Sequence, residues 1–373
     1  MATATGVAIE DVRQVLEHGK DVGQVSQWTL MRWRFMQNKL SVAGGIVLII
    51  MYLLAALAPF LSPNHFDALD PDHVWASPTV IKWVNGRPAI CALEQTLNQE
   101  TFTWVYTQDC SKTYPIKFFV RGYSYRLFGI IRTDVHLFGV DPPAKLFLFG
   151  ADAQGRDLFA RVLEGSRVSL TVGLLGVALS IVIGSILGTA SGYMGGAVDN
   201  LIQRFIELLM SIPTLPLWAA IAAALPREMP VVQRYFLITL VLSLVGWTGL
   251  ARQVRGKVLA YRTLDYTLAA RLAGASHWRI ILTHMLPNAL SHIIVVGALA
   301  IPGTILGETA LSFLGLGMLP PAVSWGVLLR DAQQLQVVLQ HPWLLIPAVA
   351  VILAVTCYQF LGDGLRDAAD PYS

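Results

Sequence analysis

Long stretches without a charged residue recur along this chain, and they restrict its fold more than any other feature. The first runs from Leu40 to Ser62. A helix of that length, at about 1.5 Å of rise per residue, crosses a hydrocarbon core of about 30 Å. The next such stretch begins only after Arg167. With 54% hydrophobic and 14% charged residues, the composition excludes an ordinary soluble domain and indicates a polytopic membrane protein.

The apolar stretches predict an all-α membrane fold with six spanning helices and a β-rich extracytoplasmic insert between the first two. In the second helix, Gly184, Gly188 and Gly192 recur every four residues, which predicts close packing against another helix of the same chain. Pro213 and Pro216 interrupt the third helix; such breaks can line a path through the membrane, although packing kinks are commoner. The spans are expected at residues 40–62, 168–193, 204–225, 235–250, 289–313 and 343–360.

The distribution of basic residues predicts the orientation of these spans. The loop after the fourth span has one acid, Asp265, and six basic residues: Arg252, Arg255, Lys257, Arg262, Arg271 and Arg279. The loop before that span has only two, Arg227 and Arg234. The positive-inside rule therefore places the N-terminus and the basic loop in the cytoplasm, and six spans return the C-terminus there.

The expected domain boundaries follow from the spans. An aromatic and basic segment at residues 25–39 suits a helix lying on anionic lipid. The parts are a cytoplasmic tail with this interfacial helix at 1–39, the first span at 40–62, a periplasmic insert at 63–166, a transmembrane core at 167–361 that includes a cytoplasmic loop at 260–288, and a cytoplasmic tail at 362–373. The net charge of +3 and the absence of a nucleic-acid-binding motif give no reason to expect a nucleic-acid partner.

The insert has the patterns of strands and hairpins. Residues 80–84 run into Asn85-Gly86, a dipeptide that favours a two-residue hairpin turn. Residues 102–107 alternate between aromatic and smaller side chains, which is typical of a half-buried strand. A second hairpin is expected with its turn at Arg121-Gly122. We interpret the insert as a lid or docking surface.

Few of the cysteine and histidine residues lie in a pattern that suggests a disulfide, a metal site or a catalytic role. Cys91 and Cys110 lie in the insert, where an oxidising compartment would let them pair, and we favour the disulfide over two free thiols. Closing that loop would stabilise the insert by roughly 3 kcal/mol. Cys357 lies in an apolar run and is expected to be a small buried residue. The histidines are scattered outside any metal or catalytic motif, so no metal site and no catalytic residue is expected.

A polar, basic segment between the fourth and fifth spans, Tyr266 to Asn288, has the signals of short helices outside the membrane. Good helix formers precede Gly274, which ends or bends the first helix. Ser276 can cap a second helix, and Pro287 marks the turn back into the membrane. These patterns alone are those of an ordinary cytoplasmic loop.

The same segment resembles the EAA loop of ATP-binding-cassette (ABC) importer permeases. Its fuller form, GAS-x-x-RII-x-x-H-x-LPN, is similar to the dipeptide and oligopeptide branch, the OppC/DppC-like permeases. In that family the loop is a coupling helix that fits a groove on the ATPase. Leu268 stands where the motif has glutamate, so an ion pair from that glutamate is not expected. The resemblance implies a coupling role for Ala269, Ala270, Arg271, Gly274, Ala275, Ser276, Arg279, His284, Leu286, Pro287 and Asn288.

Further motifs extend the resemblance to about residues 30–62 and 146–373. FGADAQGRDLFAR, before the second span, is similar to a family motif; its Asp152, Arg156 and Asp157 suggest either a charge-latched turn or a contact with the pore mouth or binding protein. GETALSFLGLG contains Glu308, an acid near the end of a span that is a functional candidate or a cap for the next loop. LGDGLRDAADP matches the family's C-terminal tail.

The resemblance implies a type I importer permease, half of a translocation pore in the bacterial inner membrane. It would carry a peptide or similar small solute and work with a second, OppB-like permease, two ATPases and a solute-binding protein. The chain lacks a GxxxxGK[ST] loop, so ATP and Mg²⁺ would be bound by the partner ATPases and no cofactor by this chain. The alternative is a secondary transporter or channel that works without an ATPase; an enzyme built on the insert lacks a catalytic constellation.

Overall fold

A computed structural model describes residues 27–84, 86–97, 99, 104–226 and 228–369. Expectations for the first residues of the N-terminal tail, for Asn85, Phe102 and Arg227, and for residues 370–373 fall outside this part of the chain. The described helices are α2 (Gln27–Gln37), α3 (Lys39–Ala56), α4 (Ala58–Leu61), α5 (Leu158–Met194), α6 (Gly196–Met210), α7 (Thr214–Ala223), α8 (Val231–Tyr261), α9 (Asp265–Leu272), α10 (His277–Arg279), α11 (Leu286–Phe313), α12 (Trp325–Leu329), α13 (Leu335–Gln340) and α14 (Ile346–Ala369).

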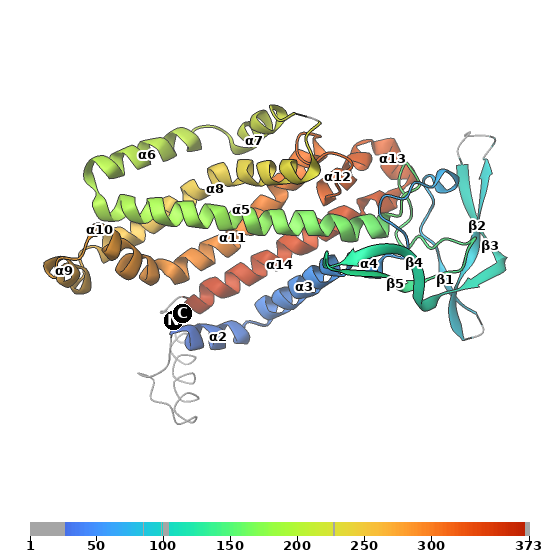
Figure 1. The fold of residues 1–373 in the computed structure, drawn as a ribbon, viewed down its shortest axis with the longest axis horizontal. Helices are drawn as coiled ribbons and strands as arrows, with labels where there is room; N and C mark the ends of the chain where they lie inside the picture. Colours follow the sequence, from blue (N-terminus) through green and yellow to red (C-terminus); the bar gives the residue numbers. More distant parts are fainter. Residues whose placement is uncertain (1–26, 85, 98, 100–103, 227, 370–373) are drawn as a thin grey trace, which may run out of the picture.

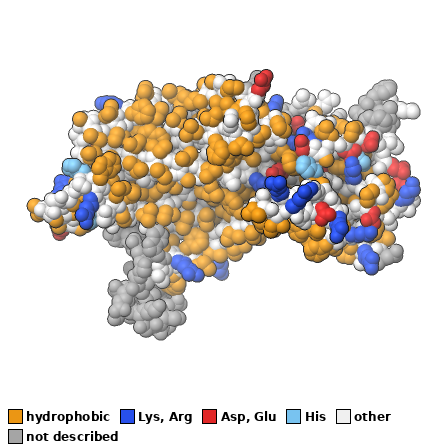
Figure 2. Space-filling model, in the orientation of Figure 1, with side chains coloured by type: hydrophobic (Ala, Val, Ile, Leu, Met, Phe, Trp, Pro, Cys, Tyr) orange, Lys and Arg blue, Asp and Glu red, His pale blue; other side chains and the backbone are white. Residues whose placement is uncertain are grey.

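The helices form an elongated bundle with the strands at one end and α9 and α10 at the other (Figure 1). Among the described residues, five helical stretches are long and apolar enough to cross a membrane, and a bent pair would make six. The five are Lys39–Ala56, Leu158–Met194, Val231–Tyr261, His277–Phe313 and Pro342–Ala369. Hydrophobic side chains cover the bundle, whereas charged ones gather over the strand-bearing end (Figure 2).

The third expected span is not one helix. Ser211 to Pro213 separate α6 from α7, and the two helices meet at 82°. The break has a local cause, because proline at 213 removes an amide donor and disfavours a helical conformation of the residue before it. The second and fourth spans are longer than expected, since α5 begins inside the predicted insert and α8 continues through the basic residues to Tyr261.

The glycine stripe of α5 packs against α8, as predicted. A Cβ added at Gly188 would lie 2.5 Å from the carbonyl oxygen of Ala251, and one at Gly184 would lie 2.8 Å from that of Trp247. Gly192 approaches the carbonyl oxygen of Arg255 in the same way. Because these three glycines carry no side chain, the backbones of α5 and α8 come into contact along three successive turns.

The insert contains two small antiparallel sheets. In the first, β1 (Ile81–Val84) pairs with β2 (Arg87–Leu97), and β2 with β3 (Trp104–Pro115). In the second, β4 (Lys117–Leu127) pairs with β5 (Ile131–Gly139), so that Arg126 lies opposite Arg132. Cys91 of β2 and Cys110 of β3 form a disulfide.

The predicted turn at Arg121-Gly122 is wrong. Both residues lie within β4, at a register irregularity between Arg121 and Tyr125, and the real turn is at residues 128–130. Gly122 is required by packing rather than by a turn, because a Cβ there would lie 2.8 Å from the ring of His136. The sequence pattern missed β5, which supplies that ring.

Candidate functional site

The segment from α9 to the start of α11 protrudes from the end of the bundle opposite the strands (Figure 1). We call residues 260–288 the candidate coupling loop. It consists of α9, a turn at Ala273 to Ser276, α10, a π-helical segment at Ile280–Met285, and the first residues of α11. Its π-helical segment continues into α11, so the loop and that span form one continuous helical path.

The turn after α9 has a defined backbone geometry. Gly274 has a φ of +78°, in the left-handed region that favours glycine. Its amide donates to the carbonyl of Arg271 at 3.0 Å, and the amide of Ala275 donates to the carbonyl of Ala270 at 3.0 Å. These two bonds form a Schellman motif, which ends the helix and sets the direction of the following chain. Ser276 then caps α10 by accepting from the amide of Arg279.

Buried side chains seat the loop on the bundle. Ile280, Ile281 and Met285 are almost fully buried in a hydrophobic cluster that includes Tyr193 of α5 and Val254 of α8. The turn of chain before α9 is fixed as well, because buried Thr267 donates a hydrogen bond to the carbonyl of Tyr261 at 2.9 Å. The loop is therefore packed against α5, α8 and α11 rather than joined to them by a loose connection.

A cation–aromatic contact adds a further link. The guanidinium of Arg271 lies 4.8 Å from the ring centre of Tyr193, and its Nε donates to the Tyr193 hydroxyl at 3.2 Å. Tyr193 is buried at the end of α5, and the ring of His277 lies beside it. The sequence analysis did not predict this contact, since the two residues are 78 positions apart.

The outer surface of the loop combines exposed hydrophobic side chains with polar and charged ones. Leu272 is 90% exposed, Trp278 57% and Leu268 44%. We call these three residues the apolar ridge. Of the predicted coupling residues, Ala269, Arg271, Gly274, Ser276, Arg279, Pro287 and Asn288 are exposed, while Ala270, Ala275, His284 and Leu286 are half-buried. The three ridge side chains are exposed, and the sequence analysis named only Leu268 among them, as the residue in place of the motif's glutamate.

The charged residues before α5 are turned inward. Asp152 and Asp157 are buried, and Arg156 pairs with Asp152 at 2.8 Å. Arg161, which the sequence analysis missed, lies 3.4 Å from the same carboxylate. These groups form the latched turn that was one of the two predicted alternatives. Internal partners hold both aspartates, and a contact of this turn with a pore mouth or binding protein stays a prediction.

Asp157 is the N-cap of α5. Its carboxylate accepts from the amide of Phe159 at 2.9 Å and from the side-chain amide of Asn64 at 2.9 Å. Burial raises the pKa of Asp157 to about 7, against the opposing effect of these hydrogen bonds. The residue therefore fixes where the long helix begins, and its charge changes near neutral pH.

Glu308 is fully buried in α11. Ser312 donates to one of its carboxylate oxygens at 2.7 Å, and Ser169 of α5 donates to the other at 3.2 Å. Ser169 also accepts from the amide of Trp325, and Ser312 from that of Met318. Glu308 thus joins α11 to α5 and to the loop that follows α11, which accounts for an acid at this depth.

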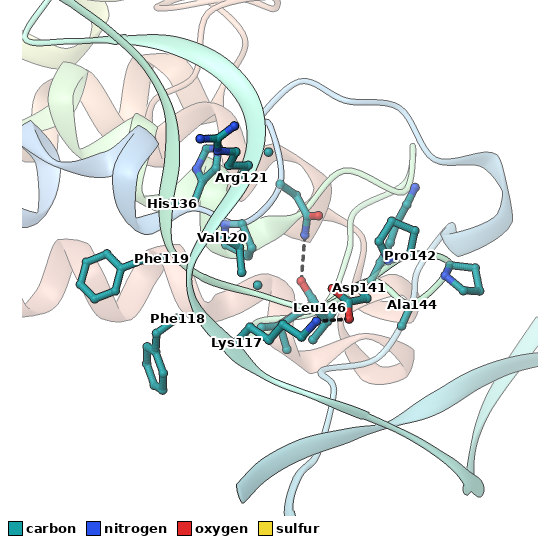
Figure 3. Close-up of a pocket in the computed structure, with 17 residues that line it drawn as sticks. Lys117, Phe118, Phe119, Val120, Arg121, His136, Asp141, Pro142, Ala144 and Leu146 are labelled. Carbon is teal, nitrogen blue, oxygen red and sulfur yellow. Dashed lines mark hydrogen bonds and ion pairs between the residues drawn. The ribbon is translucent and has the colours of Figure 1, made fainter.

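Two hollows lie away from the candidate coupling loop. A cavity of about 540 Å³ lies under the base of β4 and β5, where Lys117 pairs with Asp141 at 2.5 Å (Figure 3). A groove of about 320 Å³ lies between α5, α8 and α11, and its lining includes Ser180, Gln253 and Gly297. No cluster of metal-ligating side chains occurs among the residues that the structure describes.

Known proteins are similar to this chain over nearly its whole length. Residues 180–371 match the family of binding-protein-dependent transport system inner membrane components, and residues 26–78 match the N-terminal transmembrane domain of oligopeptide transport permease C. The oligopeptide transport permease OppC of Haemophilus influenzae is 34% identical over 97% of this chain and 94% of its own. The dipeptide transport permease DppC of Bacillus subtilis is 31% identical over 92% and 86%.

These matches agree with the apolar helices and with the ordered motifs. They establish a multi-pass protein of the bacterial inner membrane that is a transport component rather than an enzyme. The chain therefore belongs to the binding-protein-dependent transport system inner membrane components, the permease subunits of ABC importers.

Proposed function

We propose that this chain forms half of the translocation pore of a peptide importer and receives the work of ATP hydrolysis through the candidate coupling loop. The observation that carries the proposal is the apolar ridge, three exposed hydrophobic side chains on a loop whose underside is fixed by buried ones. Exposed leucine and tryptophan on a rigid support are typical of a protein-binding surface. The permeases for oligopeptides and dipeptides among the relatives favour peptides as the solute.

The coupling follows from how the loop is attached. The Schellman turn at Gly274 fixes the ridge relative to α9, and the contact of Arg271 with Tyr193 ties the loop to α5. The π-helical segment leads directly into α11. When two partner ATPases close on ATP and Mg²⁺, they would move the ridge, and α5, α8 and α11 would tilt with it. This is a switch between two states, driven by differential binding.

The topology that we propose has six spans, with α6 and α7 together as the third. The termini and the candidate coupling loop lie in the cytoplasm, and the strands lie in the periplasm. Two observations support it. Basic residues gather at the loop end of α8 and in the loop, and the Cys91–Cys110 disulfide suits an oxidising compartment. Glu308 and the latched turn at Asp152 then lie toward the periplasmic side.

The other half of the pore would come from a second, OppB-like permease. The groove between α5, α8 and α11 supports this arrangement, because Gln253 and Ser180 bring polar atoms to an otherwise apolar helical surface. We propose that this groove is the chain's contribution to the path. A solute-binding protein would deliver the peptide at the strand-bearing end.

Replacing Leu272 with alanine tests the role of the ridge. Burying a leucine side chain at an interface is worth about 2 kcal/mol, so the affinity for the ATPase subunits should fall about thirty-fold. The matched control is Leu339→Ala in α13, because Leu339 is 75% exposed at the opposite end of the bundle. ATPase binding to the permease pair in nanodiscs and peptide-stimulated ATP hydrolysis are the measurements. Equal binding by both variants, or peptide flux by the permease pair without ATPases, would contradict the proposal.

A further inference from the structure

The hairpin of β4 and β5 ends in an unusual surface. Its turn and the adjoining residues expose Phe128, Ile130 and Ile131, and Ile130 is 85% exposed. Phe128 has a φ of +52°, which glycine or asparagine adopts far more readily than an aromatic residue. A bulky side chain is thus kept at the turn against its backbone preference, and such outliers gather at functional sites.

Contacts along the hairpin show that it returns toward the helical bundle. Phe138, near its base, packs against Phe159 in the first turn of α5. Nearer the hairpin's turn, the ring of His136 lies 2.9 Å from the carbonyl oxygen of Pro59 in α4. Pro59 lies three residues after the last residue of α3, so β5 approaches the bundle as it nears the turn. Figure 1 shows β4 and β5 beside α4.

The point where the charge-free part of α5 begins can be located relative to the hairpin. Arg167 of α5 donates to the carbonyls of Ala55 and Ala56 at the end of α3, and α5 has no charged residue beyond it. Phe159 precedes Arg167 by eight residues, or about 12 Å of helix. The strand from His136 to Ile131 adds up to about 15 Å toward the bundle. The hairpin is therefore long enough to bring its apolar turn to the level of Arg167.

Two arginines flank this turn. Arg126 and Arg132 are direct partners across the hairpin and are both exposed, and no ion pair to either is found within the described part of the chain. With Ser124 and Tyr125 they line a hollow of about 450 Å³. Asp134 follows Arg132 on the same face of β5 but lies farther from the turn. The charge beside the apolar turn is therefore positive.

We propose that the β4–β5 hairpin is a membrane anchor, with its apolar turn in the headgroup–acyl boundary and the Arg126–Arg132 pair binding phosphates of anionic lipid. Apolar and aromatic side chains at the tip with cations immediately behind them match the polarity gradient of a bilayer surface. A protein partner is less suited, because the estimated reach of the hairpin brings its turn to the level of the apolar surface of α3, on which Leu53 and Ile49 are exposed. The inference holds whichever side of the membrane carries the strands, and so does not depend on the proposed function.

The depth of the turn tests this directly. A nitroxide attached to Ile130→Cys in the full chain, in nanodiscs of phosphatidylcholine and phosphatidylglycerol, should collide more with oxygen than with a water-soluble nickel chelate. The control label, at Trp83→Cys on exposed β1, should show the reverse. Preferential collision of the position-130 label with nickel would overturn the proposal, as would protection from both reagents, which would mean that protein covers the turn.

The headgroup site has its own test. Native mass spectrometry of the full chain should show retained phosphatidylglycerol that the Arg126→Gln, Arg132→Gln double variant loses. Two cations near an anionic surface correspond to a preference of up to about thirty-fold over phosphatidylcholine. Arg87→Gln with Lys112→Gln removes the same charge from the other sheet and should leave retention unchanged. Equal losses in both double variants, or displacement of the lipid by free phosphate, would overturn the assignment.

Discussion

Substituting Gly274 with alanine isolates the backbone geometry of the candidate coupling loop. At a φ of +78°, a residue with a Cβ costs about 1–2 kcal/mol more than glycine. Nothing lies within 4 Å of an added Cβ, so no steric clash contributes. The variant loop can relax while it is free, but it must regain the left-handed turn to present the apolar ridge. The cost therefore appears in binding, as a loss of ATPase affinity of about five- to thirty-fold.

Asparagine at the same position is the matched control, because its side chain is larger than that of alanine but tolerates the left-handed region. Gly274→Asn should retain most of the wild-type affinity. Both variants should unfold at the wild-type temperature, since the position is exposed and lies outside the spans. Titration of the ATPases onto permease pairs in nanodiscs measures the effect. Wild-type binding by Gly274→Ala, or equal weakness of the alanine and asparagine variants, would refute the reasoning.

Two further substitutions test the framework that carries the loop. Gly188→Ala places a Cβ 2.5 Å from the Ala251 carbonyl and should destabilise the purified protein by about 1–3 kcal/mol, whereas Gly249→Ala, where nothing lies within 4 Å, should not; equal unfolding midpoints would contradict the packing. In the folded protein the pKa of Asp157 is about 7, against an ordinary 3.8, so the folded state binds the proton more tightly. Its contribution to stability is therefore present at low pH and is lost as the pH rises through about 7. The free energy of unfolding should fall by up to roughly 4 kcal/mol. Asp157→Asn should flatten the dependence of the unfolding midpoint on pH between about 4 and 7, and an unchanged slope would show that another group is responsible.

Local sequence patterns were sufficient to predict several features of the structure. The glycine spacing of α5 predicted a close helix contact because small residues at every fourth position form one face of a helix. Gly274 predicted the end of α9 because a left-handed residue is needed there. The ordered motifs indicated the family. In each case the relevant residues lie within a few turns of one another, so their spacing alone defines the geometry.

Features that join distant parts of the chain were not predictable in this way. The turn of the second hairpin was misplaced because its register depends on β5 and on the His136 ring that packs on Gly122. Glu308 was expected near the end of a span, as a functional candidate or a cap for the next loop. Its link to that loop through Ser312 is found, but its partner Ser169 on α5, 139 residues away, was not predictable. The inward position of Asp152 likewise depends on Arg161, a buried cation in the first turns of α5.

By itself, the sequence determined that the chain crosses a membrane, roughly where its apolar helices lie, and which loop carries the family's coupling motif, because hydrophobic length and short-range helix signals act locally. Only the tertiary structure decided which side chains of that loop face outward, which charges are paired inside, and that α6 and α7 meet at 82°. These depend on which surfaces meet, since burial and hydrogen bonding are settled by neighbours that are distant in the chain.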